Sequence, residues 1–316
     1  MLMVASAQAQ TMYVAAAVSG NVYTYTTNGT RSTYASNISA PSGLAFDRAG
    51  NLFVSDETGD AIYKFTPAGV RTTFASNLYY PDGLAFNSAG DLFEADYGSK
   101  NIYKYTPGGM RTTFATNGAL GLAFNSAGDL FDATIDGTIY QYTPAGVVSN
   151  FASGLGGLFA LAFNNAGDLV TLDIGSGNVY DITPAGMVST FATNYSNARG
   201  FAFDSAGDLF VADYGSNSIY EITPGGVVST FATNIETPTA IAFQPTPPLL
   251  SIAMTATNTI LITWPAPSTG YVLEQSPELG SAHRIYATNR VSVVDGTNEV
   301  VVTPGTNNMF YLLANP

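Results

Sequence analysis

Three features of the sequence predict an all-β protein. A unit of about forty residues repeats from near the N-terminus to about residue 244. Each unit contains four short apolar runs separated by turn-forming residues. The composition, with 32 Gly, 19 Tyr and 19 Phe, favours strands and tight turns over helices. One phenylalanine of the unit recurs at intervals of 40, 38, 39, 40 and 40 residues: Phe46, Phe86, Phe124, Phe163, Phe203 and Phe243.

Each unit predicts four strands. Residues 41–75 read PSGLAFDRAGNLFVSDETGDAIYKFTPAGVRTTFA, in which the strands are GLAF, LFVSD, IYKF and RTTFA, called A to D. Between A and B, an Asp or Asn side chain can accept hydrogen bonds from the backbone of its own turn, and Gly50 can adopt the left-handed conformation. Between C and D, Pro67 fixes φ for a type I turn and a glycine follows. The strands are apolar on successive residues, as expected where both faces of a sheet are buried.

The two ends of the array complete one another. Residues 12–36, MYVAAAVSGNVYTYTTNGTRSTYAS, match strands B, C and D but lack strand A. Residues 239–244, TAIAFQ, match strand A alone. Five whole units and one split unit therefore predict a six-bladed β-propeller, residues 11–244, closed by pairing of its N- and C-terminal strands. Closure would remove the exposed sheet edges of an open array.

The period stops at a Pro-rich linker, residues 245–250, and a small β-sandwich-like domain is predicted for residues 251–316. Asp295-Gly296 resembles a hairpin turn. Trp264 and the following Tyr271-Val-Leu-Glu resemble the early strands of a fibronectin type III sandwich, in which the tryptophan is core. The F-Y-x-L ending is similar to small modules at the C-termini of secreted bacterial proteins. Strands are expected at 260–264, 271–275, 291–294, 299–302 and 309–313.

Composition excludes several classes of function. The net charge of −13 would repel a nucleic-acid backbone, and no stretch of ~18 apolar residues predicts a membrane span. Cysteine is absent, which excludes disulfides and thiolate chemistry. The only histidine, His283, lies outside the propeller and is interpreted as a surface residue. A Ser-His-Asp triad within the propeller is therefore excluded, as is a histidine-dependent lyase of the virginiamycin B lyase type.

The N-terminus predicts export. Residues 1–10 read MLMVASAQAQ, in which Ala7 and Ala9 stand as in an A-x-A cleavage site before Gln10. We interpret residues 1–10 as the residual end of a signal peptide whose charged region and most of whose apolar stretch are not in this sequence. The expected location is secreted, periplasmic or at a bacterial cell surface. The alternative is an ordinary N-terminal segment.

The unit PxGLAFDxAGNLFVSD…IYKF resembles the NHL repeat and the related repeats of the senescence marker protein/gluconolactonase family, over residues 12–244. That scaffold hosts lactonases, lyases, phosphotriesterases and binding proteins, so the resemblance implies architecture more than activity. Gluconolactonase-like enzymes hold a divalent metal with an early Glu and with Asn and Asp from turns just before strand A. The residues at that turn here are Ser42, Asp82, Leu120, Phe159, Arg199 and Thr239.

Of these six turn residues, only Asp82 matches a metal ligand. One carboxylate makes a poor site for a hard cation, so no cofactor is expected, although calcium at Asp82 stays open. Asp82 and Arg199 belong to opposite blades of a six-fold ring and would face each other across its axis. For Asp82, a turn former or a partner of Arg199 is favoured over a metal ligand. The two residues are interpreted either as a polar clamp for a small ligand or as two solvated rim charges.

Strand B ends in an aspartate in four units, which raises the question of a carboxylate ring. We favour a structural role, in which each carboxylate accepts backbone N–H bonds of the following loop. Thr134 and Ala17 take the position in two other units, so a ring would be incomplete. The four aspartates are Asp56, Asp96, Asp173 and Asp213.

The A–B and C–D turns are nearly identical between units, whereas the D–A and B–C loops of the opposite face differ. These loops carry Tyr79, Tyr80, Tyr97, Phe159, Tyr195 and Tyr214, alongside Asp60, Lys100, Asp136 and Arg199. Aromatic faces beside charged groups are typical of sugar or peptide sites. The alternative is that the aromatic rings only shield loop backbone.

The sequence therefore predicts a monomeric, non-catalytic exported propeller that binds a small molecule, carbohydrate, peptide or partner protein through this face. The candidate ligand-binding residues are Asp82, Arg199, Phe159, Tyr97, Tyr214 and Tyr80. One alternative is a gluconolactonase- or paraoxonase-like hydrolase of lactones, esters or phosphotriesters with a calcium-like ion near Asp82, for which no catalytic residue is identified. Another is a scaffold module that uses residues 249–316 for attachment or export.

Overall fold

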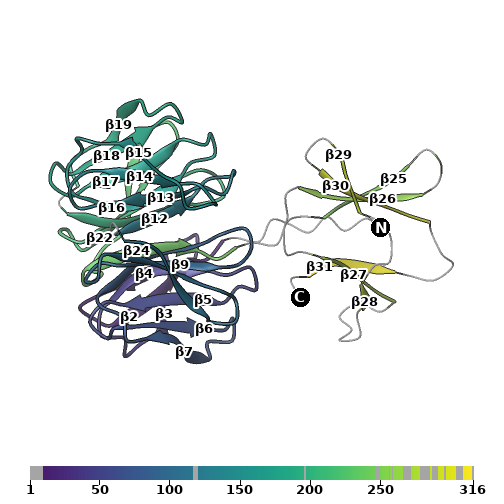
Figure 1. The fold of residues 1–316 in the computed structure, drawn as a ribbon. Coiled ribbons are helices and arrows are strands. Elements are labelled where there is room, and N and C mark those ends of the chain that lie inside the picture. Colours follow the sequence, from purple (N-terminus) through teal and green to yellow (C-terminus); the bar gives the residue numbers. More distant parts are fainter. Residues whose placement is uncertain are drawn as a thin grey trace. The chain divides into compact units, whose positions relative to one another are not determined.

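The computed structural model describes residues 10–116, 120–195, 197–245, 250–255, 257, 259–265, 272–277, 285–286, 291–294, 297–303 and 309–314. Every regular element among them is a β-strand (Figure 1). They form two compact units, Gln10–Gln244 and a second unit that begins at Pro245. The predicted signal-peptide residues 1–9, linker residues 246–249 and His283 lie outside the described residues.

The first unit has six four-stranded antiparallel sheets among its described residues. Sheet one contains β4 (Pro41–Phe46), β5 (Leu52–Asp56), β6 (Ala61–Phe65) and β7 (Arg71–Ser76). Sheet two contains β8 (Pro81–Phe86), β9 (Leu92–Asp96), β10 (Asn101–Tyr105) and β11 (Arg111–Ala115). Sheet three contains β12 (Gly121–Phe124), β13 (Leu130–Ala133), β14 (Ile139–Tyr142) and β15 (Val148–Ala152).

The remaining sheets follow the same order of strands A to D. Sheet four contains β16 (Leu158–Phe163), β17 (Leu169–Asp173), β18 (Asn178–Ile182) and β19 (Val188–Ala192). Sheet five contains β20 (Ala198–Phe203), β21 (Leu209–Asp213), β22 (Ser218–Ile222) and β23 (Val228–Ala232). Sheet six contains β24 (Pro238–Phe243), β1 (Met12–Ala16), β2 (Asn21–Tyr25) and β3 (Arg31–Ala35). This unit is a β-propeller.

Sheet six joins the two ends of the propeller sequence. β24 pairs with β1 in antiparallel register, with Met12 opposite Phe243 and Val14 opposite Ile241. The Gln244 amide extends the ladder by donating to the Thr11 carbonyl at 2.9 Å. The predicted pairing of the C-terminal strand with the first strand is therefore confirmed.

Strand A of each sheet lies against strand A of its neighbours, in the order β4, β8, β12, β16, β20, β24 and then β4. Side-chain bonds to backbone join some of these strands. The Ser42 hydroxyl donates to the Pro81 carbonyl at 3.0 Å, and the Thr239 hydroxyl donates to the Pro41 carbonyl at 2.7 Å. These six strands form the inner layer of the propeller.

The recurring phenylalanine of strand A packs between successive sheets. Phe53 of β5 meets Phe74 of β7 edge-on at 5.0 Å between ring centroids, and Phe86 of the next sheet at 5.1 Å. Edge-to-face pairs add stability beyond their buried area. Phe46, Phe124, Phe163 and Phe243 occupy equivalent places. The forty-residue period thus repeats the packing between sheets.

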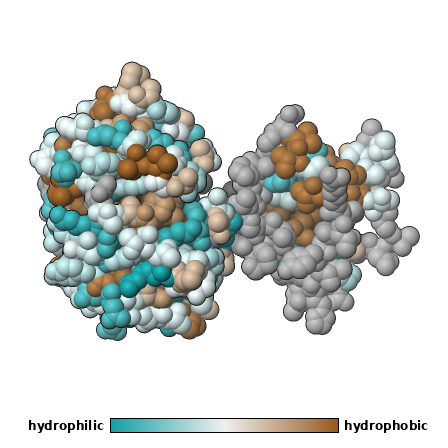
Figure 2. Space-filling view, viewed as in Figure 1, coloured by the Kyte–Doolittle hydropathy of each residue, from teal (hydrophilic) through white to brown (hydrophobic). Residues whose placement is uncertain are grey.

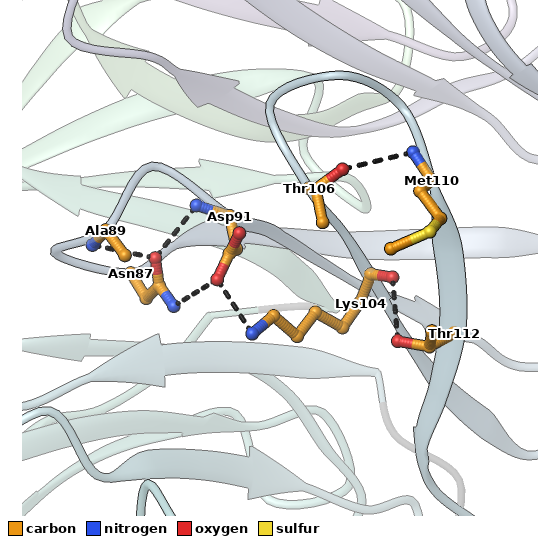
Figure 3. A network of polar contacts seen from close by, with 7 residues as sticks. All are labelled: Asn87, Ala89, Asp91, Lys104, Thr106, Met110 and Thr112. Carbon is orange, nitrogen blue, oxygen red and sulfur yellow. Dashed lines mark hydrogen bonds and ion pairs between the residues drawn. The ribbon is translucent and has the colours of Figure 1, made fainter.

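The A–B and C–D turns have the predicted chemistry (Figure 3). The Asn87 side-chain oxygen accepts the Ala89 and Asp91 amides at 2.9 and 2.8 Å, and Gly90 has φ of 84°. The Thr106 hydroxyl accepts the Met110 amide at 3.2 Å in the C–D turn. Lys104 forms a 2.8 Å ion pair with Asp91, which connects strand C to the A–B turn.

The second unit contains two sheets among its described residues. One contains, in order, β25 (Ser251–Met254), β26 (Ile260–Pro265), β30 (Thr297–Val302) and β29 (Ser292–Val294); the other contains β28 (Ile285–Tyr286), β27 (Val272–Ser276) and β31 (Phe310–Ala314). Trp264 is buried with Ile262, Leu273, Val300 and Leu313, as expected for a core tryptophan. The five expected strands are present, whereas β25 and β28 were not predicted. The proposed Asp295-Gly296 turn lies outside the described residues.

Apolar side chains reach the surface of the propeller in separate patches on the face shown in Figure 2. Among the described residues, no helix has the length and hydrophobicity needed to cross a membrane.

Candidate functional site

The inner strands surround a pocket of about 250 Å³ at the end of the propeller where the D–A and B–C loops lie. Its lining includes all six residues that the sequence placed in a turn before strand A; in the structure five of them are the second residue of strand A, and Leu120 directly precedes β12. The sequence pattern therefore identified six residues that do line one pocket in the fold. These residues are Ser42, Asp82, Leu120, Phe159, Arg199 and Thr239.

A β-bulge explains why the second residue of strand A lines the pocket. In β8, Pro81 pairs with Asp96 and Leu84 pairs with Glu94, so one extra residue is accommodated between the two pairs. A bulge bends a strand and redirects its side chains. The next residue is glycine: a Cβ on Gly83 would lie 2.1 Å from the Leu120 carbonyl oxygen. The P-x-G pattern thus places a variable residue in the pocket and lets neighbouring inner strands approach closely.

One side of the pocket is acidic. Asp82 and Glu57 both line it, from sheets two and one respectively. Burial and then the nearby Glu57 carboxylate raise the pKa of Asp82 to about 7, and Arg199 opposes this rise. Glu57 was not predicted as a site residue from the sequence. Its position directly after the strand-B aspartate, shared with Tyr97, was the available signal.

The basic side of the pocket is Arg199. Its guanidinium carbon lies 4.2 Å from the centroid of the Tyr214 ring and 5.3 Å from that of Phe159. Its Nε is buried and has no hydrogen-bond partner among the described residues. No ion pair within 4 Å joins it to Asp82 in the described part of the chain. The two charges therefore share one pocket without forming a salt bridge, and its third side, Leu120, Ile135 and Phe159, is apolar.

The aromatic candidates divide between the pocket and its surroundings. Tyr97 lines the pocket and is 47% exposed. Tyr80 stacks on Tyr79 at 4.9 Å and its carbonyl accepts the Tyr97 amide, so it supports the rim without belonging to the pocket lining. Tyr195, expected on the loop face, is only 5% exposed and packs edge-on against Tyr220 at 5.6 Å. Tyr195 belongs to a buried apolar cluster, which agrees with the alternative that the ring shields its loop.

Three other polar residues of the loop face have local roles. The Asp60 carboxylate accepts the Tyr80 amide at 3.4 Å, and Asp136 accepts the Thr134 hydroxyl. Asp60 and Lys100 both adopt positive φ, 52° and 59°. None of the three lines the pocket.

The strand-B aspartates serve the loops, as favoured from the sequence. Asp56 is buried, and its carboxylate accepts the amides of Ser39, Ala40 and Gly59 at 2.9–3.0 Å. These bonds connect the D–A loop to the B–C loop. Asp96 makes equivalent bonds to the amides of Tyr79 and Ser99. Asp173 and Asp213 accept the amides of Gly175 and Gly215 within their own B–C loops.

The pocket does not match the donor set of a calcium site. Asp82 and Glu57 provide two carboxylates, and Arg199 lines the same pocket. Calcium takes six to eight oxygen ligands, usually with excess negative charge. No cluster of three or more carboxylate, imidazole or thiol side chains suited to a metal occurs among the described residues.

Topology and structural likeness agree on the class of protein, a β-propeller. No protein-family model and no curated protein sequence matches the chain. Among solved structures, a chain in the crystal structure of a nidogen/laminin complex matches with a TM-score of 0.68 and 18% identity, covering 75% of this chain and 98% of that one. Identity at this level shows the fold alone.

Two enzyme structures have a similar fold. A candidate gluconolactonase matches with a TM-score of 0.56 and 16% identity over 70% of this chain and 84% of that one. Virginiamycin B lyase from Staphylococcus aureus matches with a TM-score of 0.54 and 13% identity over 84% of this chain and 95% of that one. The same architecture therefore accompanies different activities, and function must be argued from the site.

Proposed function

We propose that this protein is a non-catalytic binding propeller that takes a small molecule, or a short segment of a glycan, peptide or partner protein, into the mouth pocket. The observation that carries the proposal is the composition of the pocket. It combines an acidic side, an apolar side and an arginine whose Nε lacks a partner. Convergent polar groups in a largely apolar cavity are typical of ligand sites.

The pocket is better equipped to bind than to catalyse. Arg199 is fixed between Tyr214 and Phe159, which orients a donor group for an acceptor on a ligand. The sequence places no histidine or cysteine in residues 10–244, the commonest sources of a base or nucleophile at neutral pH. The similar propeller in a nidogen/laminin complex supports partner proteins as one class of ligand.

The proposal includes export. Ala7 and Ala9 precede Gln10 as in a signal-peptide cleavage site, and the absence of cysteine leaves no thiol to be oxidised outside the cell. Expression with a complete signal sequence followed by N-terminal sequencing tests this part. A mature chain that starts near Gln10 is expected, and retention of residues 1–9 on exported protein would contradict the proposed cleavage.

The binding function is tested at Tyr97. Tyr97→Ala removes an aromatic face from the pocket rim while costing little buried area, since the ring is half exposed. Affinity for a ligand found on a glycan and peptide array should fall by about 0.5–1.5 kcal/mol, the range of an aromatic contact. Stability should change by ~0.5 kcal/mol or less.

Met187→Ala is the matched control. Met187 is 68% exposed in the C–D turn, at the opposite end of strand C from the B–C loop. The Met187→Ala variant should therefore bind the ligand like wild type. An array without any ligand, or equal affinity of Tyr97→Ala and wild type, would contradict the proposal. Thermal melts of both variants separate lost binding from lost folding.

One observation favours the hydrolase alternative. The raised pKa of Asp82 places a titrating carboxyl at about 7 within a pocket, a feature found at many active sites. This alternative requires turnover of lactones, aryl esters or phosphotriesters, and a rise in melting temperature with calcium that Asp82→Ala abolishes. We expect neither effect, and observing both would replace the binding function with hydrolysis.

A further inference from the structure

The pocket is polarised across the axis of the propeller. β8, which carries Asp82, and β20, which carries Arg199, are separated by two inner strands in either direction around the axis. Glu57 adds a second carboxylate to the Asp82 side. A ligand between the two sides therefore meets anionic groups at one end and a guanidinium at the other.

The two sides do not neutralise each other. The described residues contain no Asp82–Arg199 ion pair within 4 Å, although the charges are close enough for Arg199 to lower the pKa of Asp82. Arg199 instead places its charge over Tyr214, and its Nε is buried without a partner. Because Arg199 lines the pocket and forms no ion pair there among the described residues, its guanidinium group is available to a ligand anion.

The wall between the charged sides selects for an apolar body. Leu120, Ile135 and Phe159 line the pocket on the path through sheets three and four. On the path through sheets six and one, the Thr239 and Ser42 hydroxyls already donate to backbone carbonyls of neighbouring sheets. Those hydroxyls are therefore committed to the fold, and the polar groups left for a ligand are the acids and Arg199.

The volume limits the size of the ligand. At about 250 Å³ the pocket is just below the ~300–1,000 Å³ typical of sites for drug-sized molecules. It has room for a small molecule with one apolar group.

We propose that the ligand of this pocket is a small apolar zwitterion, a free amino acid or dipeptide, with its carboxylate on Arg199 and its ammonium group on Asp82 and Glu57. This inference rests on the proposed binding function and specifies its ligand. The apolar side chain lies against Leu120, Ile135 and Phe159. Recognition depends on both charges together, because each end of the pocket repels a charge of the wrong sign.

Calorimetric titration of the full chain with a matched set of compounds tests the proposal. L-Phenylalanine and the dipeptide Gly-Phe carry both charges and one apolar group, 3-phenylpropionate lacks the ammonium group, and phenethylamine lacks the carboxylate. At least one zwitterion should bind, and 3-phenylpropionate and phenethylamine should each bind at least tenfold more weakly. Which zwitterion binds better reports the distance between the two charged sides.

Variants assign each charge to its partner. Arg199→Gln should abolish the preference for phenylalanine over phenethylamine and keep the preference over phenylpropionate. Asp82→Asn combined with Glu57→Gln should do the reverse. Arg48→Gln, which removes a positive charge from the A–B turn between β4 and β5, is the matched control and should bind like wild type. Melting curves show whether each variant folds, and Arg199→Lys should recover part of the carboxylate preference if Arg199→Gln does not fold.

The outcomes separate this inference from the binding function. One outcome would overturn the zwitterion proposal and leave the binding function in place: neutral glycans or peptides bind in a Tyr97-dependent manner, and no zwitterion binds. Single-charge analogues that bind as tightly as the zwitterion would overturn it too. Zwitterion binding that no pocket variant changes, or no binding of any compound or array ligand, would overturn both.

Discussion

The third residue of strand B shows how single substitutions change the propeller at the residue scale. It is Val14, Val54 and Val211 in three sheets, but Glu94, Asp132 and Thr171 in the others, and all six side chains are buried. The two acids face a tyrosine of strand C. The Glu94 carboxylate accepts the Tyr105 hydroxyl at 3.5 Å, whereas its other oxygen has no partner among the described residues.

Burial raises the pKa of both carboxyl groups. The pKa of Glu94 is well above its usual value, and that of Asp132 rises to about 7 through burial and then the Asp136 charge, with the Tyr142 hydroxyl opposing. Because the folded pKa of Asp132 exceeds the unfolded one, its contribution to stability is complete below pH ~4 and is lost as the pH rises through about 7. A neutral side chain at position 132 would contribute the same stability at every pH, because it does not titrate.

Asp132→Val should therefore stabilise the protein at pH 8, where valine already fills the equivalent place in three sheets. A shift from 3.8 to about 7 corresponds to at most about 4 kcal/mol at ~1.4 kcal/mol per pK unit. We expect a gain of ~1–3 kcal/mol at pH 8 and a flatter dependence of unfolding free energy on pH between 4 and 8. Urea unfolding at several pH values measures both, with exposed Asp60→Asn as control. A loss of stability at pH 8 would show that the carboxylate is required.

At the scale of the element, the strand-B aspartate links the two loops of its sheet. Asp56→Ala would leave the amides of Ser39, Ala40 and Gly59 without their acceptor. Unsatisfied buried donors cost ~1–3 kcal/mol each, and part of this is recovered by water, so we expect a loss of about 2–4 kcal/mol. Asp56→Asn should lose less, since one oxygen remains. Equal stability of Asp56→Ala and of Glu236→Ala, at an exposed site, in thermal unfolding would show that these bonds do not matter.

The sequence predicted the elements of the propeller well because each strand and turn is repeated. Turn chemistry, strand order and the aromatic packing between sheets recur, so the strands and turns predicted for one unit apply to every unit. The site is harder to predict from the sequence than the strands are, because its residues differ from one repeat unit to the next. Asp82, Phe159 and Arg199 were identified from their shared place in the repeat, but Glu57 was missed and the burial of Tyr195 stayed open, since loop conformation decides which side chains face the pocket. In the second unit, where no repeat marks the strands, the two missed strands are the four-residue β25 and the two-residue β28.

The whole propeller has two different halves at its outer strands. In sheets six, one and two, an arginine of strand D lies over a strand-C tyrosine and donates to a backbone carbonyl of the preceding sheet. These bonds join Arg31 to Asn234, Arg71 to Asn37, and Arg111 to Asn77. In sheets three, four and five the same place holds Val148, Val188 and Val228, which are exposed. The sheets near the shared sheet six are thus joined by additional bonds.

Sheet six is also where the fold is tested as a whole. β24 pairs with β1 along its length, buries Ile241 and connects to sheet one through the Thr239–Pro41 bond. Deleting residues 237–316 should therefore expose the edge of β1 and remove this packing, lowering the melting temperature sharply. Deleting residues 249–316 keeps β24 and should leave the propeller transition nearly unchanged. Differential scanning calorimetry of the two truncations beside the full chain makes the comparison. Equal melting temperatures would mean that the strand shared between the two ends does not stabilise the propeller.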